Sequence, residues 1–430
     1  MNKFWLLALP LLLPTARMGY GSYYAVAAEI AIVIFLRFAY TKGVSRSHEL
    51  YHVPKNIRYD TNSHLLIFYS SIVIIYIITI GLFSSSDDSR LYSTIFYIVR
   101  ISLWVTLFVG IRPIYRIAVK LYGPAAAFSA LLGPIVIFTA MGGVFEFFSH
   151  YTQNTSLLSL FKARQNIGGF DTIQYLRYSG FYAFPGDLGI ACVMGIALIS
   201  TVTRKKWIVY TIFLILVLLL YKTQSRAAIA TFIAYLFLVS FLRLARYKLT
   251  GAILYLLVAM ILCIIIYLKL DYVVDYIEGD YLLRNTDSTA KFIERSKRIQ
   301  EYIEFGSAPM WQKIFGLRYP YLAEFYESEW MGLISRLGII SFPIVLFFTW
   351  RSIKLALIFT LSRSRPDINM GLSFATYWIS FLLVYCSFSA GFSRPKLLII
   401  SAILAVPLID ASTEKLRVSI GMRWGYSKKR

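Results

Sequence analysis

The chain has 430 residues, of which 58% are hydrophobic and only 15% are charged, and its mean hydropathy is +0.63. Soluble domains carry about 25% charged residues, so this composition excludes an ordinary soluble protein and indicates a polytopic membrane protein. The net charge of +22 does not point to nucleic acid, because the basic residues lie mainly in short loops between apolar segments. Anionic lipid head groups are the expected partner of such loops.

A helix that crosses a bilayer needs about 20 apolar residues, which leaves room for about 12 spans and one long polar loop. The first apolar run also resembles a signal peptide, but an uncleaved first span keeps the parity of the remaining spans. The apolar runs predict an all-α polytopic fold with spans at 4–18, 22–40, 65–82, 91–111, 121–145, 187–203, 207–221, 226–243, 250–270, 328–350, 367–390 and 395–411.

These spans divide the chain into three regions. Residues 1–270 hold the first nine spans and an outer segment at 146–186, 271–327 form a large outer loop, and 328–430 hold the last three spans and a basic tail. The positive-inside rule places the basic loops in the cytoplasm. Those loops contain Lys42, Arg46, Lys55, Arg58, Arg112, Arg116, Lys120, Arg204, Lys205, Lys206, Arg243, Arg246, Lys248, Arg351, Lys354, Arg363 and Arg365.

Two cations lie on the outer side near short connections. Arg226 opens the span after the turn at 222–226, and the small residues that follow it allow tight helix packing. A cation kept on this side against the topology rule predicts a buried or cavity-facing arginine, although snorkelling at the interface is the alternative. Arg177 precedes a Gly- and Pro-rich approach to the sixth span, and snorkelling is again its alternative.

The polar loop is the most distinctive stretch. Residues 291–305 read as an amphipathic helix on which Arg295 and Arg298, three residues apart, can face one phosphate group. Glu327 and Glu329 follow just before the next span. Cations beside carboxylates at a membrane face suit a phosphate-bearing lipid and an acid or base that acts on it. A solvated loop with self-compensating charges, and helix capping by either glutamate, are the alternatives.

No cofactor or metal is predicted. The three cysteines lie in apolar spans without paired spacing, and the four histidines form no HExxH pattern. The sequence also lacks GxxxxGK[ST] and a GxGxxG that follows a strand. Any activated sugar is therefore expected to arrive already attached to the substrate.

Four segments together resemble the superfamily of O-antigen polymerases and O-antigen ligases from bacterial envelopes. In chain order they are "RYSGFYAFPGDLG", "TQSRAAIATFIAYLF", "RSKRIQEYIEFGSAPMWQKIFGLRY" and "ESEWMGLISRLGIISF". The resemblance implies a helical fold of the GT-C type and a polymerase at the periplasmic face of the bacterial inner membrane. It implies undecaprenyl-pyrophosphate-linked oligosaccharides as substrates, membrane lipids and a chain-length regulator as partners, and no metal.

The resemblance also implies roles for individual residues. Arg177, Arg226 and one of Arg295 and Arg298 would hold the donor pyrophosphate, and Glu327 or Glu329 would be the general base. Glu327 and Ser328 stand where the family has His-Asn, and the ligases depend on that histidine, so the departure favours a polymerase. The alternatives are a ligase that transfers polymer to the lipid A core, and a flippase for the lipid-linked repeat. The flippase is disfavoured because charges concentrate in one late loop.

Overall fold

The computed structural model describes residues 88–152, 178–182, 185–203, 205–247, 310, 330, 342–361, 368–389 and 395–412. This part of the chain is almost entirely helical and contains no strand. Its elements are α4 (Asp88–Tyr122), α5 (Pro124–Tyr151), α7 (Pro185–Leu198), the 3₁₀ turn η5 (Ile199–Thr201), α8 (Lys206–Thr223), α9 (Arg226–Tyr247), α15 (Phe342–Leu361), α16 (Ile368–Ser380), the π-helical η8 (Phe381–Tyr385), α17 (Cys386–Phe388) and α18 (Pro395–Ser412). The predicted all-α class is confirmed for these residues.

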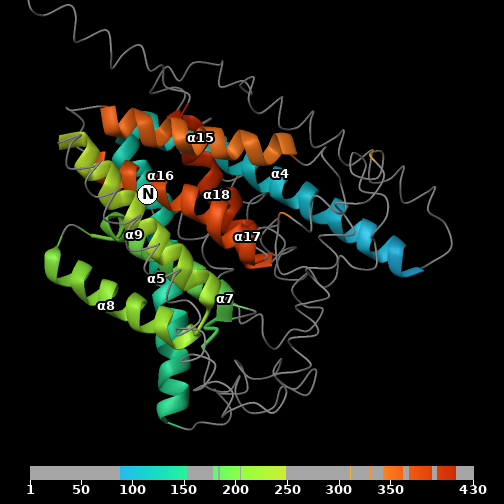
Figure 1. Cartoon of the computed structure of the whole chain (residues 1–430), viewed down its shortest axis with the longest axis horizontal. Coiled ribbons are helices and arrows are strands. Elements are labelled where there is room, and N and C mark those ends of the chain that lie inside the picture. The colour runs from blue at the N-terminus through green and yellow to red at the C-terminus, as the bar shows by residue number, and fades with distance from the viewer. Residues whose placement is uncertain are drawn as a thin grey trace, which may run out of the picture.

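The helices form one bundle around a continuous apolar core (Figure 1). α7 packs between α5 and α8, α4 packs against α5 and α18, and α15 and α9 both pack against α16. The first half of α4 projects beyond the other described helices, at the right of the view. The core is filled by large side chains from distant parts of the chain, such as Phe108, Leu131, Phe374 and Trp378. Burial of such side chains is the main term that can hold the helices in this arrangement.

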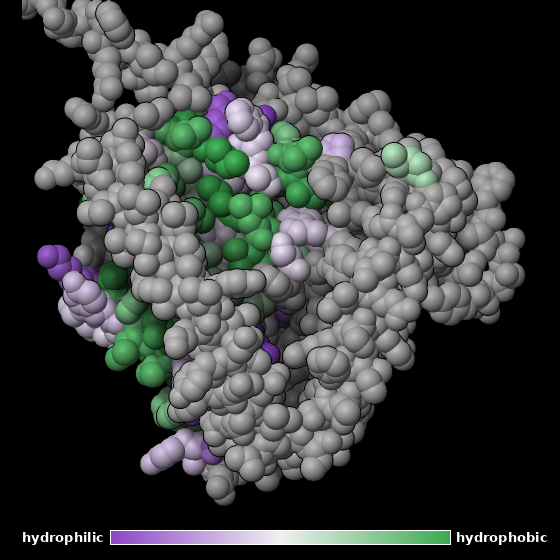
Figure 2. Space-filling model, in the orientation of Figure 1, coloured by the Kyte–Doolittle hydropathy of each residue, from purple (hydrophilic) through white to green (hydrophobic). Residues whose placement is uncertain are grey.

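Three of the described helices are long and apolar enough to cross a membrane: Pro124–Tyr151, Lys206–Thr223 and Arg226–Ala245. α8 turns apolar and aromatic side chains outward, including Trp207, Tyr210, Leu214, Leu218 and Tyr221. Figure 2 shows this hydrophobic surface on the side of the molecule where α8 and α9 lie in Figure 1. An outer helix with exposed apolar residues is stable when lipid covers it.

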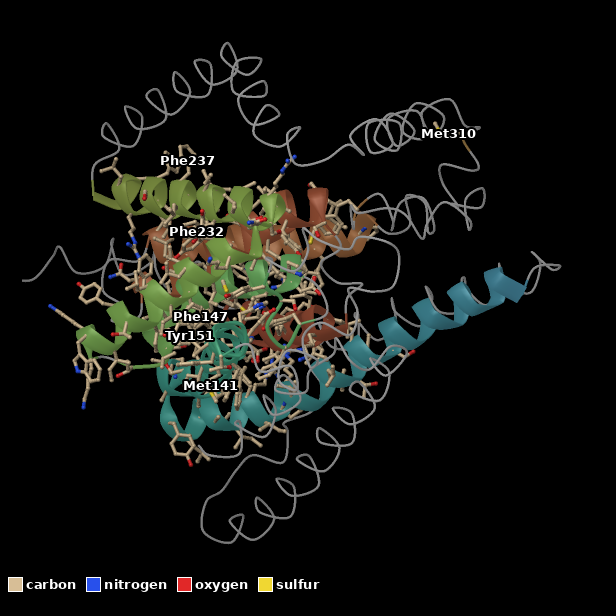
Figure 3. All side chains as sticks on the ribbon, turned by 90° about the horizontal axis from the view of Figure 1, so that it is seen from below. Met141, Phe147, Tyr151, Phe232, Phe237 and Met310 are labelled. Carbon is tan, nitrogen blue, oxygen red and sulfur yellow. The ribbon has the colours of Figure 1, made fainter. Side chains whose placement is uncertain are left out.

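Aromatic residues also gather at the C-terminal end of α5. Phe147 and Tyr151 stack with their ring centroids 6.5 Å apart, and both side chains are exposed (Figure 3). Phe148 lies beside them with more than half of its surface accessible. Exposed aromatic side chains at the end of an apolar helix are typical of the interface between membrane and water.

Small residues bring α7 and α9 close together, as the sequence predicted for the start of α9. A Cβ atom at Gly189 would lie only 2.7 Å from the Cβ of Ala228, and Ala228 is fully buried. Since real Cβ atoms do not approach so closely, only glycine fits at this crossing.

The predicted positions of several spans agree with helices of the structure. The predictions 207–221, 226–243 and 395–411 each differ from α8, α9 and α18 by a few residues. The sixth predicted span, 187–203, is shorter as a regular α-helix, because α7 ends at Leu198 and a 3₁₀ turn follows. The predicted spans at 4–18, 22–40, 65–82 and 250–270 lie outside the described residues.

The predicted loop 112–120 and the first part of the predicted loop 351–366 are wrong, because both stretches are helical, while residues 362–366 lie outside the described residues. α4 continues through Arg112 and Arg116 to Tyr122, and α15 continues through Arg351 and Lys354 to Leu361. For α4 the physical reason is plain: Arg112 is 2% exposed, and its Nη2 atom lies 2.7 Å from Oδ1 of Asp410 on α18. The arginine is satisfied inside the protein, so its charge does not require a loop in water.

The run expected as the span 367–390 consists of α16, η8 and α17 in succession. η8 is a π-helical turn in which the backbone hydrogen bonds skip one residue further than in an α-helix. Such turns open the backbone locally, and here the indole nitrogen of Trp330 donates to the carbonyl oxygen of Leu382 within the turn, at 2.7 Å.

Candidate functional site

The candidate site lies at the end of the bundle where α5, α8 and η8 finish and α7, α9 and α18 begin. Its central feature is the irregular stretch 178–182 just before α7, which belongs to the first segment of the family resemblance. This backbone forms neither helix nor strand, so its polar groups need partners from the surrounding elements.

Glu146 of α5 supplies one partner. Its side chain is buried, and Oε2 accepts hydrogen bonds from the backbone amides of Ser179, at 2.8 Å, and Gly180, at 2.5 Å. Its other oxygen, Oε1, lies 3.9 Å from Nε2 of His150, one helical turn further along α5. A buried carboxylate is stabilised when amides donate to it in this way.

The turn after α8 supplies a second partner. The amide of Tyr178 donates to the carbonyl oxygen of Lys222 at 3.1 Å, and the ring of Tyr178 stacks on His150 with centroids 5.0 Å apart. Burial, together with the carboxylate of Glu146, raises the pKa of the Tyr178 phenol above its ordinary value. Tyr178 therefore stays neutral around pH 7.

Lys396 at the start of α18 supplies a third partner. Its Nζ donates to the carbonyl oxygen of Phe181 at 2.5 Å and lies 5.6 Å from the centre of the Tyr182 ring. The side chain is only 3% exposed, so an ammonium group replaces its water shell with a carbonyl and aromatic faces. Tyr182 in turn shares a 2.8 Å hydrogen bond with Thr139 of α5, and its burial raises the pKa of its phenol.

The α8–α9 connection is as short as the sequence predicted. α8 ends at Thr223, Gln224 adopts a left-handed conformation with φ 49°, and Arg226 is the first residue of α9. The hydroxyl of Ser225 accepts from the amide of Ala228 at 3.4 Å, as an N-cap residue does. Arg226 itself is exposed, so the prediction of a buried side chain is wrong, and a cavity-facing or interfacial arginine remains.

The start of α7 touches this connection. A Cβ atom at Gly186 would lie 3.5 Å from Oγ of Ser225 and 3.4 Å from the hydroxyl of Tyr385, in η8. Asp187, the next residue, is 2% exposed. The α8–α9 turn, the π-helical turn and the beginning of α7 therefore meet at one point, beside the hydroxyl groups of Ser225 and Tyr385.

The structure thus brings together two of the predicted segments that are distant in sequence. Tyr178, which directly follows Arg177, bonds to Lys222, and Gly186 lies beside Ser225, which directly precedes Arg226. Trp330, which directly follows Glu329, bonds to η8. The predicted site residues Arg177, Arg295, Arg298, Glu327 and Glu329 themselves lie outside the described residues.

Sequence reasoning missed three buried charges at this end: Glu146, Asp187 and Lys396. A signal was present for each, because an ionisable residue within or at the edge of an apolar run marks a functional or paired position. The sequence predicts Glu146 at the start of the outer segment 146–186, whereas α5 continues to Tyr151 and buries it.

Among the described residues, no three His, Cys, Asp or Glu side chains are grouped to hold a metal ion. Comparison with protein-family models, with curated proteins and with solved structures finds no match to this chain. The geometry and the residue chemistry therefore carry the functional argument.

Proposed function

We propose that this protein is a membrane glycosyltransferase that joins oligosaccharide repeat units carried on undecaprenyl pyrophosphate, at the periplasmic face of the bacterial inner membrane. The single observation that carries the proposal is the contact between the stretch 178–182 and the α8–α9 turn. The amide of Tyr178 and the carbonyl oxygen of Lys222 are 3.1 Å apart. The two segments that contain Arg177 and Arg226 therefore meet at one end of an apolar bundle.

The chemistry follows from the substrate. The bond between the anomeric carbon of the growing chain and its pyrophosphate oxygen breaks, and a bond from that carbon to a hydroxyl oxygen of a fresh repeat unit forms. Glu327, or alternatively Glu329, takes the proton of that hydroxyl, and the lipid pyrophosphate leaves with the electron pair. Direct displacement of this kind inverts the configuration of the anomeric carbon.

The arginines have the complementary role. A guanidinium group makes paired hydrogen bonds to phosphate oxygens and stabilises the charge that grows on the leaving group. Arg177, Arg226 and one of Arg295 and Arg298 are proposed to hold the diphosphate. The exposure of Arg226 supports this role, because a substrate that arrives through the lipid must reach the side chain from outside the described bundle.

The experiment is reconstitution of the purified protein in vesicles with a synthetic lipid-linked repeat unit. A polymerase produces a ladder of products that differ by one repeat, with one lipid pyrophosphate released for each bond formed. Product formed only after lipid A core is added would indicate a ligase. Movement of the lipid-linked unit across the bilayer without a new glycosidic bond would indicate a flippase. Either result contradicts the proposal.

A further inference from the structure

Glu146 is a carboxylate inside an apolar helix, and the proposed reaction does not use it. It lies in the run "GGVFEFF" of α5, and its side chain is 2% exposed. A charged group is costly at such a position unless it has a structural or chemical role.

The hydrogen bonds of Glu146 are made to backbone amides. Oε2 alone accepts two hydrogen bonds, from the amides of Ser179 and Gly180. Since Oε2 accepts both bonds and the side chain is only 2% exposed, Glu146 is placed to hold backbone. A proton-transfer group would need hydrogen-bond reach to the substrate.

The stretch 178–182 is held from three directions, and Glu146 makes the only contact with two successive amides among the described residues. The α8–α9 turn accepts from Tyr178, and Lys396 of α18 donates to Phe181. Gly180 has φ +56°, a left-handed conformation that a residue without a Cβ atom adopts at little cost. The carboxylate thus fixes both the position and the direction of this backbone.

We propose that Glu146 is a positioning residue that holds the stretch 178–182 in place at the candidate site. The consequence for activity depends on the proposed function, in which Arg177 binds the diphosphate. The anchoring itself does not depend on it.

Three substitutions in the full chain separate geometry from charge. Glu146→Gln is neutral but has the same length, so its carbonyl oxygen can accept from both amides. Glu146→Asp keeps the charge but is one methylene group shorter and cannot reach both amides. Glu146→Ala removes the acceptor. Ser149→Ala is the matched control, because Ser149 is buried on the same helix but its hydroxyl donates to Phe145 within α5, at 2.8 Å.

The first readout is hydrogen exchange of the Ser179 and Gly180 amides in the reconstituted protein, measured by mass spectrometry. Loss of charge-assisted bonds should speed exchange by about 10-fold or more in Glu146→Ala and Glu146→Asp. We expect an increase below about 3-fold in Glu146→Gln, where both bonds persist without the charge, and none in Ser149→Ala. Unchanged exchange in the alanine and aspartate variants would overturn the anchoring. If the alanine variant does not fold, the aspartate variant decides.

The second readout is the rate of polymerisation per folded molecule. If Glu146 acts by positioning, the polymerisation rate falls in the order wild type, Glu146→Gln, Glu146→Asp, and kcat of Glu146→Asp is about 10-fold or more below that of the wild type. A catalytic carboxylate would give the reverse order of the two variants, and a purely structural one would lower the melting temperature without changing the specific rate. Either result overturns the proposal. A wild-type protein without polymerase activity overturns the proposed function instead, and exchange still decides the anchoring.

Discussion

Asp410 near the end of α18 accepts hydrogen bonds from two arginines of α4. Arg112 donates to Oδ1 through Nε at 2.8 Å, and Arg116 donates to Oδ2 through Nε at 3.1 Å. Arg112 is 3% exposed at its side chain, whereas Arg116 is 30% exposed. The buried member of this network needs its partner more than the exposed member does, because water can replace the carboxylate only for Arg116.

Removing Asp410 should therefore destabilise the protein strongly. We expect Asp410→Ala to lower the free energy of unfolding by about 3–5 kcal/mol, since Arg112 loses its carboxylate in a buried setting. Arg116→Ala should cost about 1 kcal/mol or less. Unfolding of the detergent-solubilised protein by denaturant titration measures both values. Equal losses in the two variants would show that burial does not govern the strength of this network.

Gly180 offers a second test at a single residue. Its φ of +56° is unfavourable for a residue with a Cβ atom, and that atom would lie 3.3 Å from the carbonyl carbon of Gly142. Gly180→Ala should lower stability by about 1–2 kcal/mol for the conformation, with a further loss for the contact.

Gly123 is the matched control for Gly180, because it has φ +83° but nothing lies within 4 Å of its Cβ position. Gly123→Ala should show only the conformational cost. Thermal unfolding of both variants in micelles checks the difference. A larger loss in Gly123→Ala would contradict the close approach of Gly180 to α5.

At the scale of elements, apolar runs with short connections could be predicted from the sequence, and long-range partners could not. The limits of α8, α9 and α18 follow from local composition, so they agree within a few residues. The ends of α4 and α15 were missed because a charged residue reads as a loop unless its partner is known. Arg112 has its partner 298 residues away in the chain.

The same limit applies to the candidate site. The short turn before Arg226 and the small residues that follow it could be predicted, because both are local features of the sequence. The hydrogen bonds from Ser179 and Gly180 to Glu146 join residues more than 30 positions apart, and no local sequence pattern predicts them. The contacts that hold the stretch 178–182 could therefore not be predicted from the sequence.

The π-helical turn η8 gives a test at the element scale. Trp330→Phe keeps the aromatic packing but removes the indole donor to Leu382, so the free energy of unfolding should fall by about 1 kcal/mol. Under the proposed function, activity should fall further than stability explains, because Trp330 follows Glu329 in the chain.

The control for this prediction is Trp207→Phe. Trp207 lies on α8 with 67% of its surface exposed, so its replacement should change neither quantity beyond experimental error. Denaturant titration and the polymerisation rate, measured on the same preparations, separate the two effects. Identical behaviour of the two tryptophan variants would contradict a role for the contact with η8.

At the scale of the whole molecule, the bundle has two chemically different ends. At one end, Arg112 and Arg116 form an ion network with Asp410. On the same side, Nη2 of Arg243 on α9 lies 3.4 Å from Oγ of Ser373. The other end holds an irregular backbone stretch, three buried charges and Arg226. Under the proposed function, the diphosphate of the lipid-linked substrate is bound at the end that holds Arg226.

Arg226 and Arg243 lie on the same helix, at opposite ends, and therefore give the most direct test of the proposed function. The measurement is the rate of repeat-unit polymerisation by vesicles that contain Arg226→Ala or Arg243→Ala at equal folded amounts. We expect a loss on the order of 100-fold for Arg226→Ala, because under the proposed function this guanidinium stabilises the leaving pyrophosphate, and a rate near wild type for Arg243→Ala. Equal rates in the two variants, or a greater loss in Arg243→Ala, would contradict it.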